Sequence, residues 1–123
     1  MKRTELGGLS VDELVEQFTE IGIAQSEALL GDEIERFNRL FRELRRVNAE
    51  LKRRPGDARR VLTRLYGHRN IHVWLNAAKE TLAIAPEEAR RQLHAIKDSR
   101  RFPQAGDAGM ALWTLDEGID RPT

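Results

Sequence analysis

Apolar residues recur every three or four positions along most of this chain, which is the spacing of one face of an α-helix. The clearest run covers about a third of a helix circumference, as expected for a helix with one buried face. Its members are Ile34, Phe37, Leu40, Phe41, Leu44, Val47 and Leu51. A similar run precedes it, formed by Val11, Leu14, Val15, Phe18 and Ile21. No segment of useful length alternates apolar and polar residues, so the pattern predicts an all-α fold without a sheet.

Capping residues and helix breakers divide the pattern into about six helices. Ser10 with Glu13, and Asp32 with Glu35, have the spacing of a capping box, in which two side chains satisfy amides at a helix start. The predicted helix starts are Ser10, Asp32, Asp57, Asn70, Pro86 and Asp107. The clearest predicted stops are Gly31, Pro55-Gly56 and Gly118.

Three aromatic residues in the second half of the chain lead to different expectations. Phe102 lies in a predicted loop over residues 98–106 and is expected to insert into the core. Trp113 stands between Leu112 and Leu115, so we expect it to be buried as well. For Trp74, the sequence is consistent both with packing in the core and with exposure as a contact for a partner.

The composition sets further limits. The 123 residues suffice for one domain, which we expect over residues 1–123 with flexible termini at 1–9 and 120–123. Cysteine is absent, which excludes disulfides, thiolate metal sites and cysteine nucleophiles. No segment approaches the roughly 20 apolar residues of a membrane span, and the amino terminus lacks an apolar signal region. We therefore expect a cytoplasmic protein that does not enter a membrane.

The net charge of +1 conceals a strong separation of charge along the chain. Residues 1–35 carry two basic and nine acidic side chains, a net charge of −7. Residues 36–69 carry twelve basic and three acidic side chains, a net charge of +9. The sequence thus predicts an acidic first helix followed by a basic segment.

Within the basic segment, arginines recur at helical spacing. Arg39, Arg46 and Arg53 follow one another every seven residues, and Arg42 lies beside them, roughly opposite the apolar stripe. Such a cluster can bind phosphates of a nucleic acid. It can equally be a solvated or protein-facing surface, because Glu35, Glu43 and Glu50 have the spacing to pair with these arginines. No aromatic ladder for stacking bases accompanies it, so we favour the second interpretation.

Residues that carry chemistry do not form a recognisable site. Of the histidines His68, His72 and His94, the first two are four apart, but Asn70 between them marks a helix boundary, and we expect all three in loops or on the surface. A helical zinc motif is absent, and no serine lies in the turn that activates a nucleophile. The sequence therefore predicts no catalytic residue, metal or cofactor, and a protein that is not an enzyme.

The segment Leu65–Ile96 resembles a HEAT-type repeat, a helix pair that stacks with its neighbours into a superhelix. The matching residues are Asn70, Val73, Ala77-Ala78-Lys79, Leu82, Pro86 and Leu93. Ile71 and Trp74 depart from the pattern, which commonly has proline and arginine at these positions. The resemblance implies a short right-handed α-α superhelix of HEAT-like hairpins with capping helices.

Two further segments, Glu50–Asp57 and Phe102–Ile119, resemble a small bacterial family of HEAT-like domains that is known only as a domain of unknown function. This resemblance spans about Leu14 to Ile119 and implies no activity. We expect a protein-interaction module that binds a protein or peptide on a helix-lined surface, as an immunity protein does. Its expected contacts are Trp74, Arg39, Arg42, Arg46 and Arg53. The alternative is a nucleic-acid-binding domain that uses the basic segment 36–69.

Overall fold

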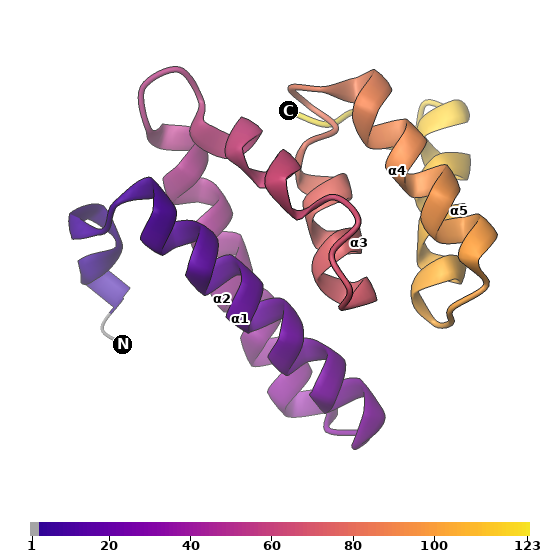
Figure 1. The fold of residues 1–123 in the computed structure, drawn as a ribbon, viewed down its shortest axis with the longest axis horizontal. Coiled ribbons are helices and arrows are strands. Elements are labelled where there is room, and N and C mark those ends of the chain that lie inside the picture. The colour runs from indigo at the N-terminus through magenta and orange to yellow at the C-terminus, as the bar shows by residue number, and fades with distance from the viewer. Residues whose placement is uncertain (1–2) are drawn as a thin grey trace. The chain divides into compact units, whose positions relative to one another are not determined.

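The computed structural model describes residues 3–123, and side chains from Leu6 onward. This part of the chain contains five α-helices, two 3-10 helices and no strand, which confirms the all-α fold (Figure 1). The elements are η1 (Arg3–Gly8), α1 (Val11–Leu30), α2 (Ile34–Arg53), η2 (Ala58–Leu65), α3 (Ile71–Glu80), α4 (Pro86–Ser99) and α5 (Gln104–Asp116). No described helix is both long and apolar enough to cross a membrane.

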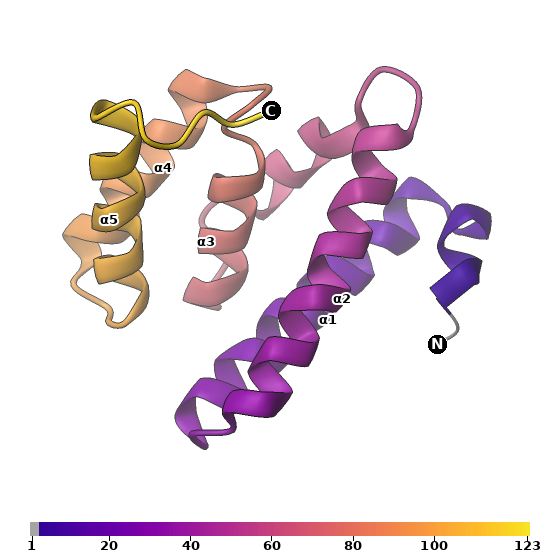
Figure 2. The ribbon, with the colours of Figure 1, turned by 180° about the vertical axis from the view of Figure 1, so that it is seen from behind.

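The chain divides into two compact units, Met1–Val61 and Leu62–Thr123, with the boundary inside η2. The predicted third helix is η2, a 3-10 helix instead of an α-helix. In the first unit, α1 and α2 lie side by side as a helical hairpin (Figures 1 and 2). Its buried residues are Leu14, Phe18, Ile21 and Ala28 of α1 and Leu40, Leu44, Val47 and Leu51 of α2.

The two predicted capping boxes of the hairpin have different outcomes. At α1 the prediction is confirmed, because the Glu13 amide donates to Ser10 Oγ at 3.1 Å and the Ser10 amide donates to Glu13 Oε1 at 2.9 Å. At α2 the prediction is wrong, because Glu33 precedes the helix and makes no side-chain cap. Asp32 has a φ of 55° in the turn after Gly31, whereas a helix-capping residue has an extended backbone.

Arg54 holds the residues that precede α1. Its guanidinium donates to the carbonyl oxygens of Leu6 at 3.1 Å and Leu9 at 2.7 Å, and also to Glu50 at 2.6 Å. Leu6 is buried. Residues 6–9, which the sequence assigned to a flexible terminus, are therefore tied to the end of α2.

The second unit contains α3, α4 and α5 (Figure 2), which pack around a core of small and branched side chains. Its buried members are Ile71, Leu75, Ala78, Leu82, Ala89, Leu93, Ile96, Ala108 and Leu112. Asn70 caps α3 as predicted, because its side chain accepts hydrogen bonds from the amides of His72 and Val73. Pro86 occupies the first turn of α4, also as predicted.

Helix α5 differs from the prediction in where it begins and which side chains it buries. It starts at Gln104, three residues before the predicted cap Asp107, and the buried Gln104 and Ala105 belong to its first turn. Trp113 is 54% exposed, so its predicted burial is wrong. The reason is rotational: Leu112 takes the inward position, and the next residue lies about 100° around the helix.

The predicted burial of Phe102 is wrong for a related reason. The loop before α5 is shorter than expected, and Phe102 stands at its end with 70% of its surface exposed. The helix buries the small side chains of Ala105 and Ala108 instead. The core of the second unit is thus closed by alanines and Leu112, and two aromatic residues remain outside it.

Candidate functional site

Exposed apolar and basic side chains occur together on one side of α2. We define the α2 outer face as Ile34, Phe41, Arg42, Arg45 and Lys52, all of which are exposed. At about 100° of rotation per residue these positions fall within roughly 100° of one another. They lie to one side of the buried Leu40, Leu44, Val47 and Leu51, with Phe41 nearest to them and Arg42 farthest away.

Two large hydrophobic residues of this face are open to solvent. Ile34 is 67% exposed and Phe41 is 47% exposed, although the sequence pattern placed both in the buried stripe. The buried residues of the stripe are Leu40, Leu44, Val47 and Leu51, and Ile34 and Phe41 lie at its edge. The guanidinium of Arg45 lies over the Phe41 ring, 6.0 Å from its centroid, which is the outer limit of a cation–π contact.

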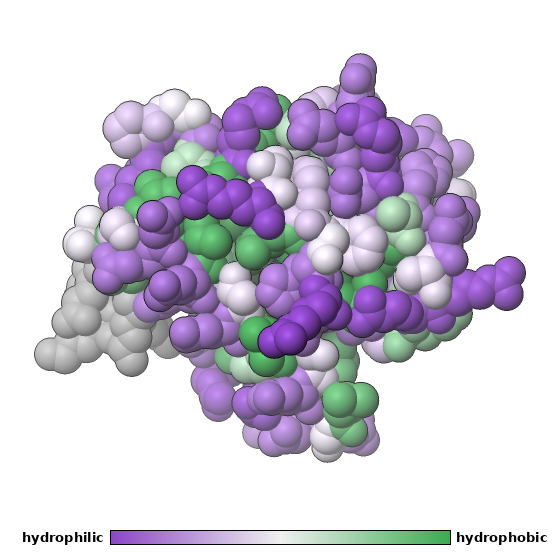
Figure 3. All heavy atoms as spheres, viewed as in Figure 1, coloured by the Kyte–Doolittle hydropathy of each residue, from purple (hydrophilic) through white to green (hydrophobic). Residues whose placement is uncertain are grey.

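The apolar surface continues onto the tip of the hairpin. Leu29 and Leu30 are exposed at the end of α1, and hydrophobic side chains appear at the lower end of the space-filling view (Figure 3). A shallow depression is found here, lined by Ala28, Leu29, Asp32, Glu33, Ile34 and Phe37. An apolar side chain of a partner could enter it beside Ile34.

The four arginines that the sequence singled out are all on α2. Arg39, Arg42 and Arg53 are exposed as expected, whereas Arg46 is half-buried. Arg39 pairs with Glu43 at 3.7 Å, and Arg53 pairs with Glu50. The sequence predicted that Glu50 pairs with Arg53, and the structure confirms this pair. Arg39 was expected to pair with Glu35, and its pair with Glu43 is a different one.

Several other basic side chains of the segment 36–69 are also engaged. Arg36 pairs with Glu27 at 3.4 Å and with Glu33 at 3.2 Å. Arg59 is buried and forms a two-point contact with Asp57, with distances of 2.9 and 2.7 Å. These contacts reduce the positive field that the sequence composition predicts.

Two of the paired carboxylates, Glu50 and Asp57, have a lowered pKa. Hydrogen bonds from Arg54 and Arg53 hold the pKa of Glu50 below its ordinary value. The hydrogen bond from Arg59 likewise lowers the pKa of Asp57. Both carboxylates are therefore ionised at neutral pH, and their role is to hold arginines in place.

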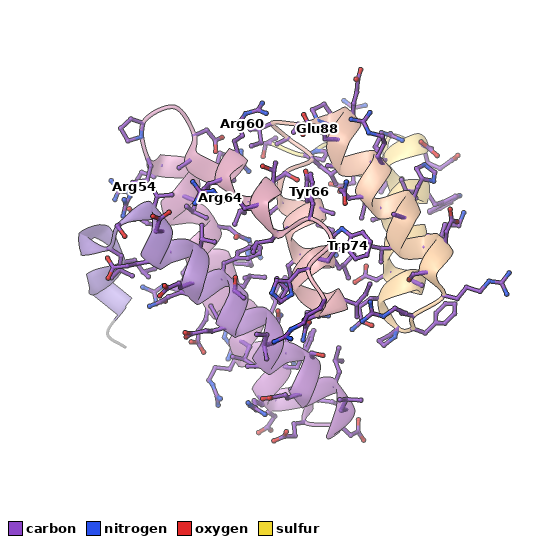
Figure 4. The ribbon with its side chains drawn as sticks, in the orientation of Figure 1. Arg54, Arg60, Arg64, Tyr66, Trp74 and Glu88 are labelled. Carbon is purple, nitrogen blue, oxygen red and sulfur yellow. The ribbon has the colours of Figure 1, made fainter. Side chains whose placement is uncertain are left out.

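Trp74, the predicted apolar contact, belongs to the second unit and not to the unit that carries the arginines. It is partly buried and packs against the core of α3, α4 and α5. Its indole Nε1 donates to Gln92 Oε1 at 2.8 Å, so its polar atom is satisfied within the unit. Figure 4 shows its position on α3. Only its exposed edge remains for a partner.

The histidines have separate surroundings. His72 is buried, contrary to the prediction of a loop or surface position, and its Nδ1 lies 3.2 Å from Gln104 Nε2. Burial lowers the pKa of His72 to about 4, so the ring is neutral at pH 7. His68 Nδ1 accepts a hydrogen bond from the Asn70 amide, and His94 is exposed. Within the part of the chain that the structure describes, no three metal-ligating side chains come together.

The chain is similar both to a protein family and to a solved structure. The model of a family described as "Domain of unknown function (DUF2019)" matches residues 12–116. The crystal structure of the protein RPA1889 from Rhodopseudomonas palustris CGA009 has 48% sequence identity and a TM-score of 0.94. That match covers 96% of this chain and 98% of the other. No curated protein matches the chain.

Proposed function

This chain belongs to the DUF2019 family, and we propose that it is a non-enzymatic protein-interaction module that binds its partner on the α2 outer face. The observation that carries the proposal is the exposure of Ile34 and Phe41 beside Arg42 and Arg45. In this proposal the α3–α4 pair serves as a HEAT-like hairpin of the scaffold. The protein acts in the bacterial cytoplasm.

The residue types of this face are those that contribute most to protein interfaces. Aromatic residues and arginine are enriched at the buried centre of interfaces, where lysine is depleted. Fully burying a side chain such as Ile34 or Phe41 contributes about 1.5–3 kcal/mol. Arg42 and Arg45 flank this apolar centre, and flanking charges set the orientation and choice of a partner.

The partner that fits is an acidic amphipathic segment. An α-helix with apolar side chains at three- and four-residue spacing would cover Ile34 and Phe41, and its carboxylates would meet Arg42, Arg45 and Lys52. An immunity protein, which binds and blocks a toxin, is one concrete form of this function, and it follows from the HEAT-like resemblance.

Nucleic-acid binding by the segment 36–69 is the weaker alternative. Arg36, Arg39, Arg53 and Arg59 each pair with a carboxylate, so binding a phosphate would first require breaking an ion pair. The surface also holds one aromatic residue, Phe41, where a single strand would need a series of rings.

The test is affinity capture from the native host with wild-type protein and two variants. Phe41→Ala removes the centre of the α2 outer face, and Phe102→Ala removes the same type of side chain, more exposed, from the second unit. We expect wild type and Phe102→Ala to recover a stoichiometric protein partner and Phe41→Ala to lose it at least tenfold. Equal recovery by all three proteins would contradict the assignment.

Measuring binding at several salt concentrations distinguishes nucleic-acid binding from protein binding. Binding of a nucleic acid weakens steeply between about 50 and 200 mM salt, because phosphate contacts release counterions. Specific binding of DNA or RNA with this dependence, together with no captured protein, would favour the nucleic-acid function and overturn our proposal.

A further inference from the structure

A second apolar surface lies on α5, in the other unit and apart from the proposed function. We define the α5 apolar face as Phe102, Gly106, Met110 and Trp113. Phe102, Met110 and Trp113 are all exposed large hydrophobic residues. Gly106, Met110 and Trp113 fall within about 60° of one another around the helix, so they form one continuous stripe.

This face also has a notch, by which we mean the space beside the Phe102 ring where Gly106 has no side chain. A Cβ at Gly106 would lie 3.7 Å from the Phe102 ring, so the ring forms one wall beside the glycine. A Cβ at Gly109 would lie 3.8 Å from the Lys97 side chain. Along α5, Gly106 and Gly109 have no side chain, and the bulky Met110 and Trp113 come after them.

The charges at the two ends of α5 are opposite. Arg100 and Arg101 lie just before α5, and Asp116, Glu117 and Asp120 lie at its end and after it. Asp107 in the first turn pairs with Lys79 at 3.3 Å, and Asp116 in the last turn pairs with Arg90 at 3.0 Å. The charges outside these pairs include Arg100 at one end and Glu117 at the other. A helix that ran antiparallel to α5 with the same sequence would place each charged end beside its complement.

We propose that two copies of this chain associate through the α5 apolar face, with their α5 helices antiparallel across a two-fold axis. An axis passing between Gly109 and Met110 sets Trp113 of one copy against the notch at Gly106 of the other, where it meets the Phe102 ring. The same axis sets Met110 of one copy against Gly109 of the other. Such an interface uses one surface patch twice, as two-fold dimers do.

The size of the face determines the expected affinity. Each large exposed side chain can contribute on the order of 100 Å², so the face is smaller than the roughly 800 Å² per partner of a standard interface. The dimer is therefore weak, because the face is at or below the small end of transient interfaces. It would form at high local concentration and dissociate on dilution.

The first test is sedimentation equilibrium of the full chain up to about 500 µM, because a weak, small interface forms only at high concentration. We expect the average mass to rise from 14.1 kDa toward twice that value. Gly106→Gln fills the notch while adding a residue that favours helix, so it should weaken dimerisation at least tenfold in a chain that stays folded. A monomer at every concentration, or a dimer unaffected by Gly106→Gln, would overturn the proposal.

The second test is covalent capture, which the absence of cysteine makes direct. Met110→Cys places a thiol next to the two-fold axis, and Leu30→Cys places one on an exposed site of the first unit. Under mild oxidation we expect Met110→Cys to form a disulfide-linked dimer at least tenfold faster than Leu30→Cys. Equal rates would contradict the proposed axis.

A charge exchange tests the antiparallel direction. Arg100→Glu and Glu117→Arg should each weaken dimerisation, because each places like charges at both junctions between the copies. The double variant should restore it toward the wild-type value. Failure of the double variant to recover would exclude the antiparallel arrangement.

Discussion

At the scale of single residues, two tryptophans show how the same side chain has different roles in one unit. Trp74 packs on the core and donates its indole proton to Gln92. Trp113 is more than half exposed and has no comparable packing. Burial and a satisfied N–H make Trp74 part of the scaffold, whereas Trp113 is available to a second molecule.

This difference predicts unequal costs of substitution. Trp74→Ala should lower the free energy of unfolding by about 2 kcal/mol, less than for a fully buried tryptophan because Trp74 is only partly covered. Trp113→Ala should change it by no more than about 0.5 kcal/mol in dilute protein. Urea unfolding followed by circular dichroism measures both. Equal losses would show that Trp113 is packed as well.

His72 predicts a pH dependence of stability. Its pKa in the fold, about 4, lies below the ordinary value of about 6.5, so the unfolded chain binds more protons between these values. The contribution of neutral His72 is complete above pH 6.5 and is lost as the pH falls toward 4, with a total of about 2–3 kcal/mol.

The measurement compares wild type with His72→Gln at several pH values. Glutamine keeps a hydrogen-bonding group near Gln104 but does not titrate. The difference in unfolding free energy between the two proteins should therefore change between pH 6.5 and 4 and be constant above that window. A constant difference across the whole range would mean that His72 is protonated as easily in the fold as in the unfolded chain.

At the scale of elements, helix ends depend on backbone conformation as well as on residue type. Ser10, Asn70 and Pro86 were identified from sequence because each lies directly before or within a first helical turn. Asp32 has the right side chain and spacing but occupies a turn with positive φ. Sequence spacing alone does not reveal that conformation.

The two sites should respond oppositely to substitution. Ser10→Ala removes a genuine cap and should cost about 1 kcal/mol. Asp32→Gly places glycine at positive φ, where it is unstrained, and should leave stability unchanged or raise it by up to about 1 kcal/mol. Thermal unfolding of both variants provides the comparison. If Asp32→Gly lowered the free energy of unfolding as much as Ser10→Ala does, Asp32 would act as a helix cap after all.

The face that a helix buries was predicted well for α2 and poorly for α5. Most of the α2 arginines are exposed because the buried residues follow a clear stripe, although that stripe also included Ile34 and Phe41, which are exposed. In α5, apolar residues surround the helix, and alanines fill the inward positions. Without the position of a neighbouring helix, the sequence cannot distinguish which of Leu112 and Trp113 points inward.

At the scale of the whole molecule, each unit combines a small core with an exposed apolar face. The first unit presents Ile34 and Phe41 among arginines, and the second presents the α5 apolar face. The sequence indicated a binding surface in the basic segment, because charge separation is visible in composition. It did not indicate two units, since no proline, glycine or charge boundary marks residue 61.

In our proposal the partner binds the α2 outer face, and two isoleucines test this directly. Ile34 on that face and Ile119 after α5 are 67% and 66% exposed, so Ile→Ala at either site removes a similar exposed side chain. We expect Ile34→Ala to raise the dissociation constant of the captured partner about tenfold, since burying its lost methyl groups contributes about 1–2 kcal/mol. Ile119→Ala should leave that constant unchanged. An unchanged dissociation constant for Ile34→Ala would contradict binding at this face.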